Sequence, residues 1–512
     1  MQTVTLSRRG FIRNAVLAAL ALRCEPLFSL ADVSPAVVRT PSGTLRGERS
    51  DGVLQFSGVP FAEPPVGPLR FRAPAPVKPW TGERDATKFA AAAMQAGEPG
   101  IAHSEDCLYL NIWAPEGKGP FPVYVWIHGG GFTAGYAFES MYNGMEITKE
   151  GVVCISVSYR LGVFGFLDLQ PLLGAEYAGS ANNGLLDLMA ALEWIQKNIS
   201  AFGGDPARIT IGGESAGAKL ADILMSVPSA KPLFNQVISE SGGAERVWTR
   251  AQSESVAHGF GEHWHTRTGS EPASILTAPA DALIKAQLEF IGAWPQHFPL
   301  RCQIDGSLIP LRPVESIGTG SSRGKRLLIG TNRDESAMFI GPHPQKDPIA
   351  ADLGNLLPEK FTPVFKKYRD VYPQMNDEQL RIRAVTAEEY WVPTMRVADA
   401  HLKGGGSAWV YRLDFSETGG FMRGYAFHSL DVRLVWNRPS PLADNAAAEA
   451  ILAHQMYQGW IAFLHGQTPA AQGVPAWPEY NSTTRPTMVF DTQNHVEQKP
   501  QEAELRLWDG VL

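Results

Sequence analysis

Five short runs of apolar, β-forming residues set the strongest limit on the fold. They cover residues 123–127, 152–157, 209–211, 327–329 and 409–411. The runs are apolar nearly throughout instead of alternating, which is typical of central strands covered on both faces. A helical pattern at residues 185–199 lies between them, and Asn182 and Asn183 can cap its start. Strands alternating with helices predict the α/β class, with a mostly parallel central sheet and helices on both faces.

Two longer stretches, residues 245–293 and 342–402, have helix-type spacing interrupted by proline and glycine. We expect them to be helical, cap-like insertions over the carboxyl edge of the sheet. No internal repeat, charge block or flexible linker divides the chain. The sequence therefore predicts a single domain over residues 32–512.

The first 31 residues have the pattern of an export signal. Arg8 and Arg9 precede an apolar stretch at residues 15–22, and Ser29-Leu30-Ala31 has the small-x-small pattern of a cleavage site. The paired arginines are typical of a twin-arginine signal, which predicts a periplasmic or secreted protein beginning near Asp32. A chance arginine pair near an ordinary start is the alternative.

Composition excludes several classes of protein. The 512 residues carry a net charge of -7 without a basic stripe, so no nucleic-acid partner is expected. No apolar run reaches the roughly 18 residues of a membrane span. The four cysteines show no C-x-x-C spacing, which predicts neither a zinc site nor a disulfide framework. We expect no metal and no organic cofactor.

The pattern G-x-S-x-G occurs at residues 213–217, between a predicted strand and a predicted helix. This is the context of a nucleophile elbow, in which small residues allow a tight turn that presents Ser215 at the start of a helix. A second match at residues 320–324 follows a polar loop and leads into a strand, so we assign it to a turn.

A glycine triplet, residues 129–131, follows another predicted strand. Glycines leave backbone N–H groups accessible to a substrate oxygen, so Gly130 and Gly131 are predicted to form an oxyanion hole with the N–H of Ala216. The preceding His128 is expected to brace this loop.

Several ordered motifs then resemble one family. Residues 56–62 and 105–111 are similar to its first and second signatures, and residues 159–166 and 202–206 frame the elbow as they do in the family. Together they resemble the type-B carboxylesterase and cholinesterase-like family of α/β-hydrolases over nearly all of the mature chain. The resemblance implies the α/β-hydrolase fold and a serine esterase that acts on small-molecule esters through an acyl-enzyme.

The resemblance also implies the rest of a catalytic triad. Glu335 takes the place of the family's acid and His428 that of its general base, and the order Ser, Glu, His agrees with that of α/β-hydrolases. From the residues alone, Asp334 could serve as the acid equally well. The family pattern further places Glu214 and Ser241 beside the triad, although a partly exposed carboxylate and a core hydroxyl are the alternatives.

The chain departs from the family at Met94, where a cysteine often bridges to the position of Cys107, so Cys107 is expected to be a free thiol. Other functions stay open: the same machinery could cleave amides, carbamates or lactones or transfer the acyl group. The chain could also resemble the non-catalytic, cholinesterase-like adhesion proteins. No motif specifies the natural substrate or an oligomeric state.

Overall fold

The computed structural model describes residues 33–97, 99–340, 356–420, 422–441 and 443–512. The predicted export signal, residues 1–31, lies outside the described residues, as do residues 342–355 of the second predicted insertion.

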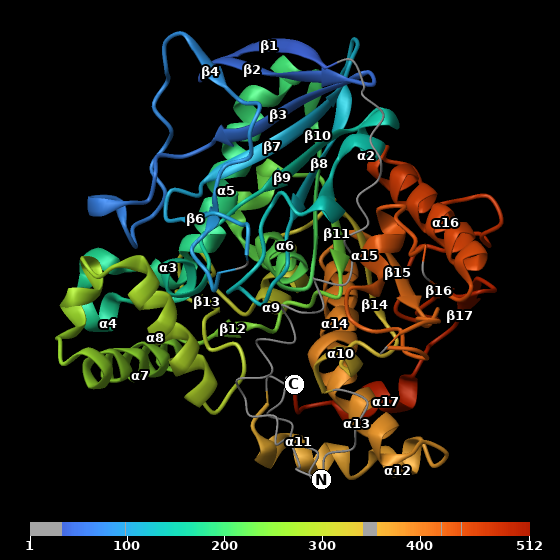
Figure 1. The fold of residues 1–512 in the computed structure, drawn as a ribbon. Coiled ribbons are helices and arrows are strands. Elements are labelled where there is room, and N and C mark those ends of the chain that lie inside the picture. Colours follow the sequence, from blue (N-terminus) through green and yellow to red (C-terminus); the bar gives the residue numbers. More distant parts are fainter. Residues whose placement is uncertain (1–32, 98, 341–355, 421, 442) are drawn as a thin grey trace.

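A large twisted sheet runs through the molecule (Figure 1). Among the described residues it contains thirteen strands, with β4 (Glu83–Asp85) paired to β2 at one edge. The other strands lie in the order β1 (Ser34–Thr40), β2 (Gly43–Ser50), β3 (Val53–Pro60), β7 (Tyr109–Pro115), β9 (Val153–Val157), β8 (Phe121–Ile127), β10 (Gly204–Glu214), β11 (Gln236–Glu240), β14 (Arg326–Asn332), β15 (Ser407–Leu413), β16 (Thr487–Phe490) and β17 (His495–Glu497).

Every neighbouring pair from β9 to β16 is parallel, whereas the β1–β2, β2–β3, β3–β7, β7–β9 and β16–β17 pairs are antiparallel. The five predicted strands are confirmed as parts of β8, β9, β10, β14 and β15. The α/β class with a mostly parallel central sheet is therefore confirmed, and the antiparallel strands at the amino-terminal edge are an addition that the apolar runs did not predict.

The central strands are covered on both faces, as their uniform apolarity predicts. In β14, Leu327 and Ile329 pack into one hydrophobic cluster and Leu328 into another, because successive side chains point to opposite faces of a sheet. Helices α5 (Asn183–Asn198) and α6 (Ala216–Ser226) contribute to the first cluster. Helices α15 (Leu430–Val435) and α16 (Ala446–Leu464) contribute to the second.

The predicted insertions are mainly helical where the structure describes them. The first holds α7 (Arg250–Thr268) and α8 (Ala280–Ala293), and the second holds α11 (Pro358–Phe365), α12 (Tyr368–Val371), α13 (Asp377–Thr386), a π-helical turn (Ala387–Trp391) and α14 (Val392–Lys403). In Figure 1, α7 and α8 lie together at one corner of the molecule, and α11 and α12 lie below the sheet. The first insertion also contains a short strand, β12 (Val247–Trp248), which pairs with β13 (Cys302–Gln303).

The remaining short elements connect these layers. They are the helices α2 (Met145–Lys149), α3 (Gly162–Phe166), α4 (Gln170–Leu173), α9 (Pro313–Gly318), α10 (Ala337–Ile340) and α17 (Glu502–Leu507), and the paired strands β5 (Ala92–Ala93) and β6 (His103–Ser104).

The predicted cap of α5 is wrong. Asn182 occupies the N-cap position without a side-chain capping bond. Its amide instead pairs with the backbone of Gln303, donating to the carbonyl at 3.0 Å and accepting from the N–H at 2.9 Å. Asn183 donates to the carbonyl of Phe71 at 2.9 Å. Both side chains therefore fix neighbouring loops and leave the helix end uncapped.

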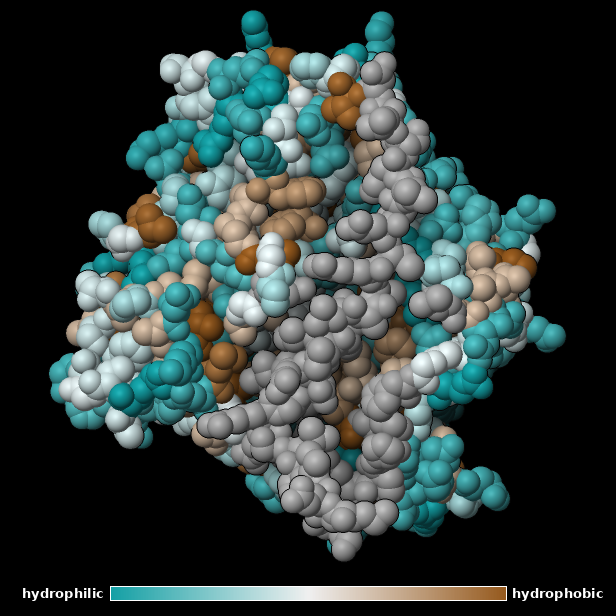
Figure 2. Space-filling view, in the orientation of Figure 1, coloured by the Kyte–Doolittle hydropathy of each residue, from teal (hydrophilic) through white to brown (hydrophobic). Residues whose placement is uncertain are grey.

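Hydrophilic residues border the face of the molecule seen in Figure 2, and apolar residues form small groups between them. None of the helices in the described ranges is long and apolar enough to cross a membrane.

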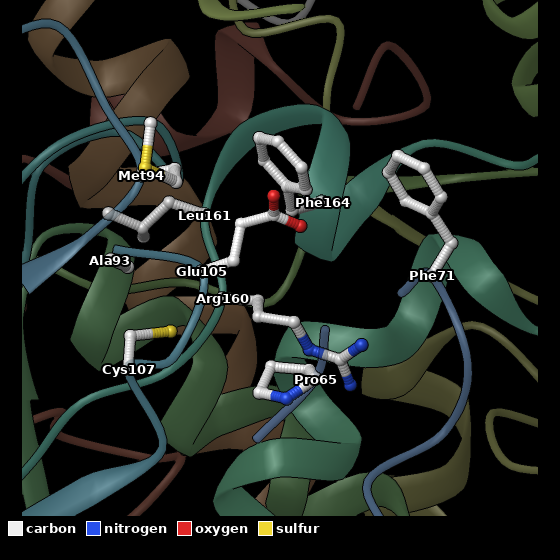
Figure 3. A pocket seen from close by; sticks show the side chains of 9 residues that line it. All are labelled: Pro65, Phe71, Ala93, Met94, Glu105, Cys107, Arg160, Leu161 and Phe164. Carbon is white, nitrogen blue, oxygen red and sulfur yellow. The ribbon is translucent and has the colours of Figure 1, made fainter. Parts of the chain in front are cut away.

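The predicted free thiol at Cys107 is confirmed. Cys107, Cys154 and Cys302 are all free and buried. Figure 3 shows Cys107 and Met94 on the wall of one small pocket. The other lining residues are Pro65, Phe71, Ala93, Glu105, Arg160, Leu161 and Phe164. Burial raises the pKa of the Cys107 thiol, which makes it a poor nucleophile.

Candidate active site

The predicted site residues follow the carboxyl ends of adjacent parallel strands. Glu214 ends β10 and is in register with Glu240, which ends β11 and is in register with Gly330 of β14. Ser215 and Ser241 come directly after β10 and β11. Because the carboxyl ends of parallel strands share one edge, the sheet brings these segments together where ligands bind in open α/β folds.

Ser215 lies on a strained turn at the amino end of α6. Its φ of 56° and ψ of -122° are unfavourable for a residue with a Cβ atom. The serine N–H donates to the Glu240 carbonyl at 2.9 Å, which ties the turn to β11. A Cβ placed on Gly217 would lie 2.0 Å from the Ile127 carbonyl oxygen, so glycine is required there for the elbow to approach β8. The local geometry is that of a nucleophile elbow.

The glycine loop after β8 packs against this elbow. A Cβ on Gly129 would lie 3.2 Å from the Ser215 Cβ, and Gly130 and Gly131 have φ values of 106° and 61°. Within the part of the chain that the structure describes, the N–H groups of Gly130, Gly131 and Ala216 donate to no protein acceptor. These three amides are thus available to stabilise an oxyanion.

His128 braces the glycine loop. Its Nδ1 lies 2.9 Å from the Gly129 carbonyl oxygen, and its ring stacks on Tyr159 with centroids 4.6 Å apart. The Tyr159 hydroxyl donates to the His128 carbonyl at 2.8 Å. Burial lowers the pKa of His128 to about 4, so this imidazole is neutral at pH 7.

Glu335 is the carboxylate that contacts the predicted base. Its Oε2 lies 2.6 Å from Nδ1 of His428. Its Oε1 accepts hydrogen bonds from the Asn332 N–H at 2.7 Å and the Ser241 hydroxyl at 2.6 Å. Both oxygens of this fully buried side chain are therefore held in place.

The neighbouring Asp334 has a different role. Its Oδ2 accepts from the Ala426 N–H at 3.0 Å and from Arg333 Nη2 at 2.8 Å, and its own N–H donates to the Ala426 carbonyl at 2.9 Å. Asp334 thus anchors the segment two residues before His428, and Glu335 reaches the imidazole.

His428 lies between two carboxylates. Opposite Glu335, its Nε2 is 3.1 Å from Oε1 of Glu214. Burial disfavours the imidazolium, but the nearby Glu214 and Glu335 outweigh this effect and raise the pKa of His428. The ring packs on Tyr390 and Phe339, with centroids 4.8 and 5.1 Å away.

Glu214 is 4% exposed, so the alternative of a partly exposed carboxylate is wrong. Its Oε1 also accepts from the Ser429 hydroxyl at 2.5 Å. Burial raises the pKa of Glu214 to about 7, although His428 and the Ser429 hydroxyl oppose this. At neutral pH Glu214 can therefore either hold or release a proton next to Nε2.

Three residues beside the site were missed by the sequence analysis: Ser429, Asp431 and Tyr390. Asp431 accepts from the Tyr411 hydroxyl at 2.7 Å and from the Asn332 side chain at 3.0 Å, beneath the Glu335 turn. Ser429 and Asp431 follow His428 by one and three residues, and this proximity in sequence is the signal that could have identified them. Tyr390 lies in the π-helical turn, and no sequence pattern singled it out.

The second G-x-S-x-G match is a turn, as predicted. Ser322 and His401 in this region are 2.7 Å apart between Oγ and Nδ1, but both side chains are fully buried. Among the residues placed by the structure, no group of three or more His, Cys, Asp or Glu is arranged to hold a metal ion.

Comparisons with known proteins agree with this geometry. The model of the carboxylesterase family matches residues 34–508. A para-nitrobenzyl esterase of Bacillus subtilis is 35% identical, covering 92% of this chain and 97% of its own length. A fumonisin B1 esterase of Sphingopyxis macrogoltabida is 32% identical, with 95% and 92% covered. A solved PNB esterase superposes with a TM-score of 0.82 at 33% identity, covering 93% of this chain and all of that one.

Proposed function

Because the chain belongs to the carboxylesterase family and is a carboxylic-ester hydrolase, we propose that it cleaves esters through a Ser215, His428 and Glu335 triad with an acyl-enzyme intermediate. The observation that carries this proposal is the contact of 2.6 Å between His428 Nδ1 and Glu335 Oε2. A proton on Nδ1 leaves Nε2 unprotonated on the side of the elbow, where a base for Ser215 is needed.

In the first half of the reaction, His428 Nε2 takes the proton of Ser215 while the serine oxygen attacks the ester carbonyl carbon. Glu335 stabilises the imidazolium, and the N–H groups of Gly130, Gly131 and Ala216 stabilise the oxyanion. The tetrahedral intermediate collapses as the C–O bond to the alcohol breaks. The leaving alcohol takes the proton from Nε2.

In the second half, a water molecule replaces the alcohol. His428 takes a proton from the water as it attacks the acyl-enzyme, and returns that proton to Ser215 as the acid leaves. Ser241 holds the second oxygen of Glu335 throughout, and Glu214 lies beside Nε2. In this proposal both are positioning residues.

The first substrates to test are small esters, including para-nitrobenzyl esters, because a relative carries that name. Amides, carbamates and lactones present the same carbonyl carbon to Ser215 and differ in the leaving group. A panel of these four bond types at matched acyl size separates the reactions, and we expect the highest kcat/KM for esters.

The decisive experiment compares the mature chain with Ser215→Ala on a chain-length series of para-nitrophenyl esters. The loss of the nucleophile is expected to lower kcat by at least about a thousandfold, because triad members act as a unit. Ser322→Ala is the matched control, since it makes the same change within the second G-x-S-x-G match and is expected to leave kcat unchanged. Full activity in Ser215→Ala would refute the proposal.

We also propose that residues 1–31 export the chain through the twin-arginine route, on the strength of the Arg8-Arg9 pair, the apolar stretch and the cleavage pattern. Replacing both arginines by lysine is expected to retain the protein in the cytoplasm of a bacterial host. Normal periplasmic levels of that variant, measured by cell fractionation, would contradict the route.

A further inference from the structure

We propose that Glu389 is a positioning residue whose ion pairs with Lys219 and Arg246 hold the nucleophile helix, the oxyanion loop and the general base in register. These three residues are called the buried ion cluster below. The inference rests on the proposed function, since it concerns the alignment of the same triad.

The buried ion cluster joins three segments that are distant in sequence. Lys219 comes from α6, Arg246 from the segment after β11, and Glu389 from the π-helical turn. One oxygen, Glu389 Oε1, lies 3.2 Å from Lys219 Nζ and 2.5 Å from Arg246 Nε. All three side chains are at most 4% exposed, so water does not screen their interaction.

Lys219 links the cluster to the nucleophile. Its N–H donates to the Ser215 carbonyl at 2.9 Å, which closes the first turn of α6. Its Nζ donates to the Gly242 carbonyl at 2.7 Å, next to Ser241, the residue that holds Glu335. A shift of Lys219 would therefore move both the elbow and the support of the acid.

Arg246 links the cluster to the oxyanion loop through Phe298. The guanidinium carbon lies 3.9 Å from the centroid of the Phe298 ring, within the range of a cation–π contact. That ring abuts Gly131, where an added Cβ would lie 2.5 Å from it. Phe298 has a φ of 51°, a strained value that persists only when its surroundings hold it. Arg301 supplies a second restraint by donating to the Phe298 carbonyl at 2.7 Å.

Glu389 itself links the cluster to the base. The next residue, Tyr390, packs its ring 4.8 Å from the His428 ring, and Lys219 Nζ lies 4.8 Å from the same tyrosine ring. The backbone here is a π-helical turn. This conformation is rare in proteins as a whole, but where it occurs it is often at a functional site. Fixing the Glu389 carboxylate thus fixes the surface on which His428 packs.

A buried ion cluster is a weak source of stability, because well-packed apolar side chains of similar volume do as well or better. Its ion pairs are, however, strongly dependent on geometry, since a buried charge that loses its partner is costly. Glu389 Oε1 can therefore keep both of its ion pairs only when the three segments that carry the cluster keep their spacing. A site that combines a nucleophile, an oxyanion loop and a base from different segments requires such fixed spacing.

The test measures the rate at which a fluorophosphonate labels Ser215, together with kcat and KM for para-nitrophenyl acetate and hexanoate. Glu389→Gln is expected to lower kcat and the labelling rate by about 10- to 100-fold with a smaller change in KM, because small misplacements cost this much. Arg246→Met is expected to lower the labelling rate, and kcat for both esters, by several-fold, since Phe298, which abuts Gly131, loses its contact.

Arg326→Met is the matched control. Arg326 also stacks on an aromatic ring, that of Trp409 at 4.9 Å, but it lies at the opposite end of β14 from the Glu335 turn. We expect it to leave kcat and the labelling rate at wild-type values.

Wild-type labelling rates and kcat in folded Glu389→Gln and Arg246→Met would overturn the inference while leaving the triad intact. A wild-type enzyme that is not labelled at Ser215 would instead overturn the proposed function. If Glu389→Gln does not fold, the double variant Lys219→Met/Glu389→Gln takes its place in the test, because it removes one charge of each sign from the cluster. Slow labelling of that double variant supports the inference, and a wild-type rate overturns it.

Discussion

The contact between Glu214 and the imidazole predicts a specific change in the pH dependence of hydrolysis. Glu214 Oε1 lies 3.1 Å from His428 Nε2, and its carboxylate helps to raise the pKa of His428. Glu214→Gln keeps the shape of the side chain and removes its charge. The pKa of His428 is then expected to fall, so the base remains deprotonated to lower pH.

The magnitude follows from the distance and from the proton affinity of Glu214 itself. Two full charges 3.1 Å apart interact by about 5 kcal/mol at an effective dielectric constant of 20, which corresponds to a ceiling of roughly 4 pKa units. The pKa of Glu214 is about 7, so the carboxylate carries only part of its charge near neutral pH, and its titration is coupled to that of His428. We therefore expect the smaller shift of about 1 unit, the low end for an opposite charge at this distance.

The assay is the pH profile of kcat/KM for para-nitrophenyl acetate, whose acidic limb reports the base in the free enzyme. The acidic limb of Glu214→Gln is expected to lie about 1 pH unit below that of the wild type. Ser429→Ala provides an independent check. It removes a hydrogen bond that favours the charged form of Glu214, so the acidic limb should move in the same direction by a smaller amount.

An acidic limb that is unchanged in Glu214→Gln, or that moves to higher pH, would refute this reasoning. The result would mean that Glu335, Asp431 and the burial of the ring set the proton affinity of His428 without Glu214.

Three further predictions concern the support of the site. Ser241→Ala removes the hydroxyl that donates to Glu335, and is expected to cost about 1 to 3 kcal/mol of stability in urea unfolding and to lower kcat. Met94→Cys is expected to form a disulfide with Cys107, seen as two fewer titratable thiols than in the reduced variant and as a gain of up to about 3 kcal/mol that reductant abolishes. Gly217→Ala places a Cβ 2.0 Å from a backbone oxygen of β8, so the variant is expected to lose fluorophosphonate labelling or to unfold.

The sequence predicts the central sheet well because its strands are buried on both faces, and continuous apolarity identifies such strands. It does not predict β1, whose side chains are mainly exposed and whose apolar residues are limited to Ala36, Val37 and Val38. The sequence also predicts the elbow, since the tight turn at Ser215 requires small residues within two positions on either side. Such a local steric constraint produces a local sequence motif.

The contacts that arrange the rest of the site are long-range. Lys219 and Glu389 lie 170 positions apart, and no spacing rule relates them. The choice between Asp334 and Glu335 likewise depends on which side chain the turn directs toward Ala426 and which toward His428. From the sequence either carboxylate could serve. The contacts in the fold separate them, because Asp334 pairs with Ala426 and Glu335 reaches Nδ1 of His428.

The position of Glu214 also bears on how strong a base His428 can be. A base with a raised pKa accepts a proton from Ser215 more readily, but a smaller fraction of it is unprotonated at a given pH. With Glu335 alone beside it, His428 would have no other nearby group on the Nε2 side to take up a proton. The pKa of Glu214 is about 7 and that of His428 is raised, so the two groups take up protons as a coupled pair. The microstate with protonated Glu214 and neutral His428 keeps the base competent, and in it the Glu214 charge that raises the pKa of His428 is absent.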